Sequence, residues 1–143
     1  MTPAEEIRDA ADWLRALATA ASTDRRGPTA RWYFKETDHR RGAGYLYSAN
    51  PNGAGVRLTH GGSSGAHGRG SHPGMHTQHG VYAAAMDPTA GLAVAALLEG
   101  VLRSARETGA AHEECDSRCS PETCDLSAAL AVARLLNNRR NDG

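Results

Sequence analysis

All three cysteines of the chain lie together with a histidine in one short stretch, AHEECDSRCSPETCDLS, which covers residues 111–127. The spacing His112-x2-Cys115-x3-Cys119-x4-Cys124 offers three thiolates and one imidazole, which are the kind and number of ligands that a tetrahedral zinc ion takes. The short gaps would let one loop curl around a single ion. Because four protein ligands leave no open position, the sequence predicts a structural rather than a catalytic zinc site.

Two other interpretations of the cysteines stay open. Two of them could form a redox-sensitive disulfide that leaves the third thiol over, or all three could be ordinary thiols. Cys124 precedes a predicted helix, where free N–H groups and the helix dipole favour the thiolate. Acidic residues surround the cluster, and we expect them to form a solvated rim rather than to replace a ligand: Glu113, Glu114, Asp116 and Glu122.

Two predicted helices would position this cluster. Asp87 caps a helix that begins at Pro88 and runs to about Glu107. The other helix, DLSAALAVARLLNN, follows the cluster, is capped by Cys124 or Asp125 and carries its apolar residues on one stripe. A zinc ion bound between them would join the two helices into an antiparallel hairpin and stabilise a small chain.

The rest of the chain predicts an α+β fold. Thr2 and Glu5 form a capping-box pattern at the start of a helix from Pro3 to about Ala21. The runs RWYFK, GYLYS and GVRLTH predict a small antiparallel meander. We expect a single domain with a helix and meander over 1–60, a flexible Gly/His-rich loop over 61–80 and a helical part over 81–143.

The histidines of this loop are also candidate ligands. His72, His76 and His79 could hold a metal ion or an anion, but their spacing is irregular. The His-Pro-Gly sequence also breaks any helix that would align them on one face. A solvated loop is therefore the favoured interpretation.

The N-terminal half combines arginines with aromatic residues. With exposed Tyr or Trp rings to stack on bases, it could bind nucleic acid. The candidate basic residues are Arg31, Arg40, Arg41, Arg57 and Arg69. The aromatic residues of this half could form a stacking platform, but packing in the core of a small sheet is the favoured interpretation; they are Trp32, Tyr33, Phe34, Tyr45 and Tyr47.

The overall composition excludes several classes of protein. Sixteen Lys and Arg balance sixteen Asp and Glu, so total charge does not indicate a strongly basic nucleic-acid binder or a polybasic membrane binder. No apolar run approaches the roughly 20 residues that cross a bilayer, and the acidic start is unlike a secretory signal. We therefore expect a cytoplasmic protein, in which clustered cysteines more often bind metal than form disulfides.

The segment VYAAAMDPTAGLAVAALLE, residues 81–99, resembles a segment of small accessory proteins of phages and prophages, the Ead-like family, and of related actinobacterial proteins. The matching residues are Tyr82, Ala84, Ala85, Asp87, Pro88, Leu92 and Ala93. The resemblance covers roughly the last 60 residues. It implies a phage- or prophage-encoded accessory protein without catalytic activity, and it assigns no catalytic residues.

No H-E-x-x-H motif, P-loop or P-C-x-x-C pair is present, so we expect a protein that is not an enzyme. The expected function is that of a zinc-stabilised interaction module that binds a host or phage protein. The Ala-rich helices also favour homo-oligomerisation. Two alternatives stay open: nucleic-acid binding through the N-terminal half, and a minor structural role in the virion.

Overall fold

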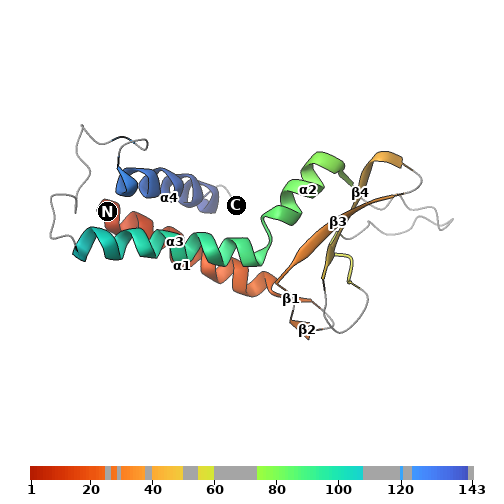
Figure 1. Cartoon of the computed structure of the whole chain (residues 1–143), viewed down its shortest axis with the longest axis horizontal. Helices are drawn as coiled ribbons and strands as arrows, with labels where there is room; N and C mark the ends of the chain where they lie inside the picture. Colours follow the sequence, from red (N-terminus) through yellow and green to blue (C-terminus); the bar gives the residue numbers. More distant parts are fainter. Residues whose placement is uncertain are drawn as a thin grey trace. The chain divides into compact units, whose positions relative to one another are not determined.

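The computed structural model describes residues 1–24, 27–28, 30–37, 40–49, 55–59, 74–107, 120 and 124–141 (Figure 1). The helices and strands are α1 (Pro3–Ala21), β1 (Thr23–Asp24), β2 (Gly27–Pro28), β3 (Trp32–Thr37), β4 (Arg40–Ser48), β5 (Met75–His76), α2 (Thr77–Ala85), α3 (Pro88–Glu107) and α4 (Asp125–Asn141). The predicted α+β class is confirmed, because helices accompany a small antiparallel sheet. Within the described part of the chain no single helix is long and apolar enough to cross a membrane, and only α2 and α3 counted together pass that test.

The chain divides into two compact units. The helical unit comprises Met1–Leu17 and Gly91–Gly143, and the sheet unit comprises Ala18–Ala90. This division differs from the one expected from the sequence, which grouped the whole N-terminal helix with the strands. Most of α1 belongs to the helical unit because its apolar stripe packs with α3 and α4.

One apolar cluster holds the helical unit together. Its buried residues are Ile7, Ala10, Ala11, Ala95, Leu98, Leu102, Leu126, Ala129, Leu130 and Ala133. Spacings of three and four residues place these side chains on one face of each helix. The predicted capping box starts α1, since the Glu5 N–H donates to Thr2 Oγ1 at 3.2 Å and the Thr2 N–H donates to Glu5 Oε2 at 2.7 Å.

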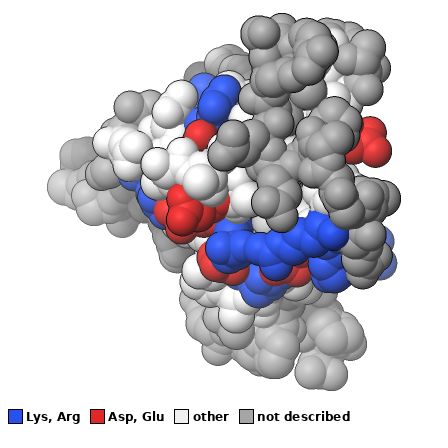
Figure 2. Space-filling view, turned by 90° about the vertical axis from the view of Figure 1, so that its left-hand side faces the viewer, with Lys and Arg blue, Asp and Glu red and all other residues white. Residues whose placement is uncertain are grey.

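Polar side chains connect α4 with α1 beside this core. Arg134 Nε lies 3.0 Å from Glu6 Oε2, and Arg140 Nη2 lies 3.4 Å from Asp9 Oδ2. The side-chain amide of Asn137 donates to the Glu6 carbonyl at 3.0 Å. Figure 2 shows basic and acidic side chains directly beside one another on the face that it draws. Exposed ion pairs contribute little individually, so the apolar cluster supplies most of the stability of this unit.

The sheet unit is built on the antiparallel hairpin β3–β4. Phe34 pairs with Leu46, and the register shifts between Glu36 and Thr37. Along the other edge of β4 the chain pairs twice, through a bridge between Tyr47 and Arg57 and through β5. The third predicted run therefore lies beside β4 as expected, but β5 completes the sheet. A separate short ribbon joins β1 to β2.

Helix α2 covers one face of this sheet. Gly80 lies against the Phe34 ring so closely that a Cβ atom at this position would overlap with the ring. Leu46, the partner of Phe34 on β4, is 6% exposed. Glycine is the residue that permits this contact, because any side chain would push α2 away from the sheet.

The start of α3 is fixed by Asp87, as predicted. Its Oδ1 accepts the N–H of Ala90 at 3.0 Å, which caps the helix, and its Oδ2 accepts the N–H of Trp32 at 3.3 Å. Thr89 donates to the Ala30 carbonyl from both its hydroxyl and its N–H, at 3.0 and 3.1 Å. The first turn of α3 is thereby bonded to the chain that leads into β3.

The predicted flexible loop over 61–80 ends earlier than expected. Met75 already pairs with Gly44 of β4, and α2 begins at Thr77. The Gly-rich composition suggested a loop, but Gly80 is glycine because of its contact with Phe34 inside a helix. Residues 61–73 of the predicted loop lie outside the described residues.

Candidate nucleic-acid interface

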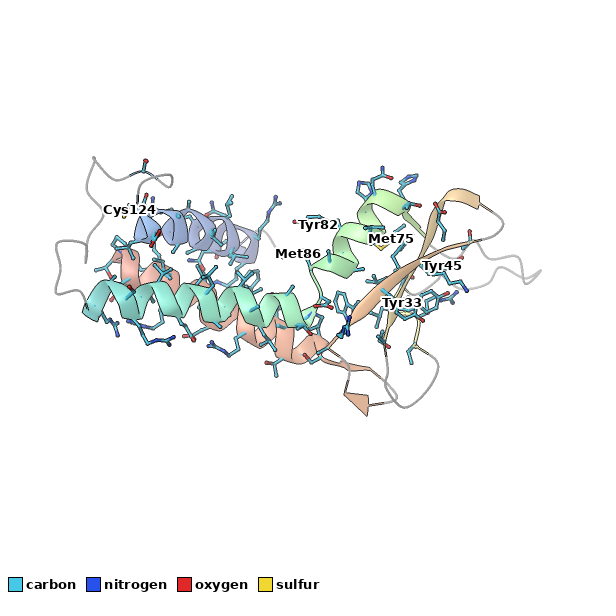
Figure 3. All side chains as sticks on the ribbon, viewed as in Figure 1. Tyr33, Tyr45, Met75, Tyr82, Met86 and Cys124 are labelled. Atoms are coloured by element: carbon cyan, nitrogen blue, oxygen red, sulfur yellow. The ribbon has the colours of Figure 1, made fainter. Side chains whose placement is uncertain are left out.

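The face of the sheet opposite α2 carries three of the four tyrosines of the chain. Side chains alternate between the two faces of a strand, and Phe34 and Leu46 lie on the face that α2 covers. The opposite face consists of Tyr33, Lys35, Tyr45, Tyr47 and Arg57, and we call it the tyrosine face. Figure 3 shows Tyr33 and Tyr45 on the side of the strands away from α2.

Tyr33 and Tyr47 form a stacked pair across the hairpin. They are direct partners in the β3–β4 register. Their ring centroids are 5.3 Å apart and their planes differ by 13°. Tyr33 remains 40% exposed, so the pair is held in place by stacking while part of it stays accessible to solvent.

The neighbouring pair combines a cation with a ring. The Arg57 guanidinium carbon lies 4.9 Å from the centroid of the Tyr45 ring, which is the geometry of a cation–π contact. The bridge between Arg57 and Tyr47 holds the arginine backbone in register beside β4. Lys35 is the cross-strand partner of Tyr45 and is exposed. Two cations and three aromatic rings thus share one face.

The charge of the chain is distributed unequally between its two units. Residues 18–90 contain eight Lys and Arg but four Asp and Glu, a surplus of four positive charges, together with six of the seven histidines. The helical unit contains eight basic and twelve acidic residues and carries the opposite surplus. The zero net charge therefore conceals a basic sheet unit, which favours contact with a polyanion.

The two acidic side chains described in the sheet unit have partners away from the tyrosine face. Glu36 accepts hydrogen bonds from Thr77 Oγ1 at 2.7 Å and from the Gly42 N–H at 3.0 Å. The Thr77 hydroxyl, followed by the Gly42 N–H, lowers the pKa of Glu36 below its ordinary value. Asp87 is held at the start of α3. Neither carboxylate opposes an anion on the tyrosine face.

The structure gives different outcomes for the five predicted arginines. Arg57 lies on the tyrosine face, and Arg31 is exposed just before β3. Arg40 and Arg41 belong to β4 by their backbone, but their side chains lie outside the described atoms, as does the whole of Arg69. Arg57 is thus the predicted residue that the structure brings to the aromatic rings.

Lys35 was not among the predicted residues, and core packing was favoured over a stacking platform for all the sheet aromatics. The core assignment suits Phe34, which packs under α2, but not the tyrosines on the opposite face. The signal was present in the alternation of the two strands, because Tyr33 and Lys35 are two residues apart, as are Tyr45 and Tyr47. The alternation separates the two faces of the sheet, but it does not tell which of them α2 covers.

The predicted zinc ligands lie mostly outside the described residues. This applies to His112, Cys115 and Cys119. Cys124 directly precedes α4 and is partly buried, and its carbonyl accepts the Ala128 N–H at 2.9 Å. Among the described side chains no three of His, Cys, Asp or Glu gather at a metal site.

Two of the three histidines that were candidate ligands lie among the described residues. His76 and His79 have ring centroids 6.0 Å apart in an edge-on arrangement, and both belong to the junction of β5 with α2. His72 lies outside the described residues.

Comparisons of the chain with known protein families, with curated proteins and with solved structures find no match.

Proposed function

We propose that the protein binds nucleic acid through the tyrosine face of its sheet unit. The observation that carries the proposal is the Arg57 guanidinium over the Tyr45 ring, directly beside the stacked pair Tyr33–Tyr47. Aromatic rings offer stacking surfaces to bases, and neighbouring cations neutralise phosphates. The proposal takes up the nucleic-acid alternative expected from the sequence, keeps its stacking tyrosines and Arg57, and adds Lys35.

The net charge of the sheet unit supports the same proposal. Its surplus of four positive charges attracts phosphates over about a Debye length, roughly 8–10 Å at physiological salt. The helical unit, with four excess negative charges, would repel the same ligand. This polarity selects which part of the chain meets a nucleic acid.

The test is the salt dependence of binding to a fluorescein-labelled oligonucleotide, measured by fluorescence anisotropy. The logarithm of the association constant should fall linearly with the logarithm of salt concentration. Lys35→Ala and Arg57→Ala should each reduce that slope by about 0.7–0.9, the value for one phosphate contact. Arg57→Ala should in addition weaken binding at every salt concentration, because it removes the guanidinium that lies over the Tyr45 ring.

The matched control is Arg103→Ala, because Arg103 is an exposed arginine on α3 in the helical unit. This variant should leave both the slope and the affinity unchanged. Absence of binding at low salt, or an equal loss of slope in the control, would contradict the proposal.

A second candidate function is the one first expected from the sequence, an interaction module for a host or phage protein. The observation in its favour is a set of apolar side chains on the outside of the helical unit. Leu97 of α3 and Leu135 of α4 are 65% and 67% exposed. Exposed leucines of this kind are typical of interaction surfaces when they are clustered. We place either activity in the cytoplasm of the host cell and propose a phage or prophage origin, with a role in the virion as the remaining alternative.

Zinc binding by His112, Cys115, Cys119 and Cys124 stays a prediction. Elemental analysis of the purified chain should give one zinc per chain, and Cys115→Ser should lose it. Helix content should fall together with the metal if the ion joins α3 to α4. Light scattering at micromolar concentration tests the expected homo-oligomer in the same samples, and a clean monomer would exclude it.

A further inference from the structure

We infer that the tyrosine face takes single-stranded rather than double-stranded nucleic acid and holds two neighbouring bases splayed apart. This inference rests on the proposed function and names the ligand class of that same site. It follows from two surfaces on which a base can stack, the Tyr33 ring and the Arg57 guanidinium, and from the distance between them.

The first platform is the Tyr33 ring. Tyr47 lies nearly parallel to it and supports it on one side, with 5.3 Å between the ring centroids. Tyr33 is 40% exposed as a whole residue, and Gly55 lies against the hydroxyl end of its ring, so a base would stack on the part of the ring that stays open. A ring that is fixed before binding loses little side-chain entropy when a base stacks on it.

The second platform is the Arg57 guanidinium on Tyr45. A guanidinium is planar, and bases stack on it as they do on aromatic rings. The guanidinium carbon lies 4.9 Å from the Tyr45 centroid, which holds the group beside the ring, and among the described residues no carboxylate forms an ion pair with it. The same group can also approach a phosphate, which joins stacking to charge neutralisation at one residue.

The spacing of the platforms excludes stacked neighbouring bases. Tyr33 faces Tyr47 across the hairpin, so Tyr45 is its diagonal neighbour, about 7–8 Å away in an antiparallel sheet. Stacked nucleotides advance only about 3.4 Å along a strand. Two neighbouring bases can reach both platforms only if they separate. A single strand can do this, whereas the bases of a duplex are paired and keep their faces hidden.

The described part of the tyrosine face also lacks a feature that reads a duplex. Groove readers insert a helix or a two-stranded ribbon into the major groove. Here α2 covers the opposite face of the sheet, and the β3–β4 pair is not a free two-stranded ribbon, because β5 and Arg57 pair along the other edge of β4. Rings carried on the strands of a sheet fit an extended single strand that lies across them.

The experiment compares one sequence of about 12 nucleotides as single-stranded DNA, as RNA and as a DNA duplex, titrated by anisotropy at low salt. The single strands should bind at least about tenfold more tightly than the duplex. Tyr33→Ala should weaken single-strand binding by about 5- to 150-fold, which corresponds to the loss of one stacked base. Tyr33→Phe keeps the ring and should change binding by less than about twofold.

The matched control is Tyr82→Ala. Tyr82 belongs to the same unit but to α2, where it is 71% exposed, and Figure 3 shows it apart from Tyr33 and Tyr45. This variant should bind like the unchanged protein. Circular dichroism checks that each variant folds, and Tyr33→Leu keeps apolar bulk without the π-face, should Tyr33→Ala fail to fold.

The outcomes separate this inference from the proposed function. Duplex binding as tight as single-strand binding would overturn the inference and leave nucleic-acid binding intact. Binding of neither form would overturn both. Equal losses in Tyr33→Ala and Tyr82→Ala would remove the tyrosine face from the interaction. Binding of a proline-rich peptide in place of any oligonucleotide would assign the face to a protein partner and overturn both proposals.

Discussion

The helical unit and the sheet unit use their apolar and aromatic residues in opposite ways. The helical unit buries Ile7, Leu98 and Leu130 in one cluster between three helices. The sheet unit buries Phe34 under α2 but places its tyrosines on the other face, which no described element covers. The charges differ as well, with four excess acidic residues in the first unit and four excess basic residues in the second.

This difference shows that averages over the whole chain describe neither unit. A net charge of zero argues against a polyanion ligand only if the charges are evenly mixed. In this chain they are divided between two units, so the relevant quantity for the proposed ligand is the charge around the tyrosine face. The same holds for aromatic content, which is low overall but concentrated on one sheet.

The largest expected effect is a core truncation in the helical unit. Leu130 is 5% exposed in the apolar cluster, and Leu130→Ala should lower the free energy of unfolding by about 2–5 kcal/mol. Leu135→Ala, on the same helix but 67% exposed, should change it by less than about 0.5 kcal/mol. Urea denaturation measures both variants.

Intrinsic fluorescence makes this a test of the comparison between units. The chain has two tryptophans, Trp13 in the helical unit and Trp32 in the sheet unit. In Trp32→Phe and Trp13→Phe backgrounds, each remaining tryptophan reports its own unit. Leu130→Ala should shift the Trp13 transition more than the Trp32 transition. Equal shifts would show that the two units unfold together.

A smaller effect is expected at the packing contact of the sheet unit. Gly80→Ala places a methyl group inside the space of the Phe34 ring, and such overpacking costs about 1–3 kcal/mol. The control is Gly100→Ala on α3, where, among the described residues, only the end of the Arg103 side chain comes within 4 Å of the added methyl, at 3.9 Å. That change should stabilise the helical unit by about 0.5–1 kcal/mol, because alanine favours the helix. The two substitutions should thus have opposite signs in thermal unfolding.

Much of the fold could be predicted because local signals fixed it. The capping box at Thr2 and the cap at Asp87 are short-range hydrogen bonds written in the sequence, and both helices begin where predicted. The limits of β5 and α2 were missed because a long-range contact decides them. In the sequence, Gly80 indicates a loop, and only the contact with Phe34 explains a glycine inside α2.

The candidate site was harder to predict for the same reason. Arg57 and the tyrosines were all noted, but their shared face depends on the pairing of β3 with β4 and on the side that α2 covers. The sequence of one strand alone determines neither this pairing nor the covered side. The cysteine cluster is the reverse case, since its spacing alone predicts a zinc site, and only Cys124 of the four ligands lies among the described residues.

The smallest expected effect is a pH dependence of stability, which arises in each unit from one carboxylate. The pKa of Glu36 is lowered by the Thr77 hydroxyl and then the Gly42 N–H, and the pKa of Glu5 is lowered by the Thr2 N–H and then its hydroxyl. A carboxyl whose pKa falls on folding stabilises the native state above its unfolded pKa, near 4.5, and loses this contribution as the pH drops through the lowered value.

Glu36→Gln should therefore destabilise the sheet unit at neutral pH and have no further effect in acid, with the change reported by Trp32. Glu5→Gln should do the same for the helical unit, reported by Trp13. Both carboxylates are fully exposed, so water and salt weaken the two effects and keep them below those of Leu130→Ala and Gly80→Ala. If Glu36→Gln shifts the Trp13 transition as much as the Trp32 transition, the hydrogen bonds of Glu36 act on the whole chain and the separation between the units does not hold.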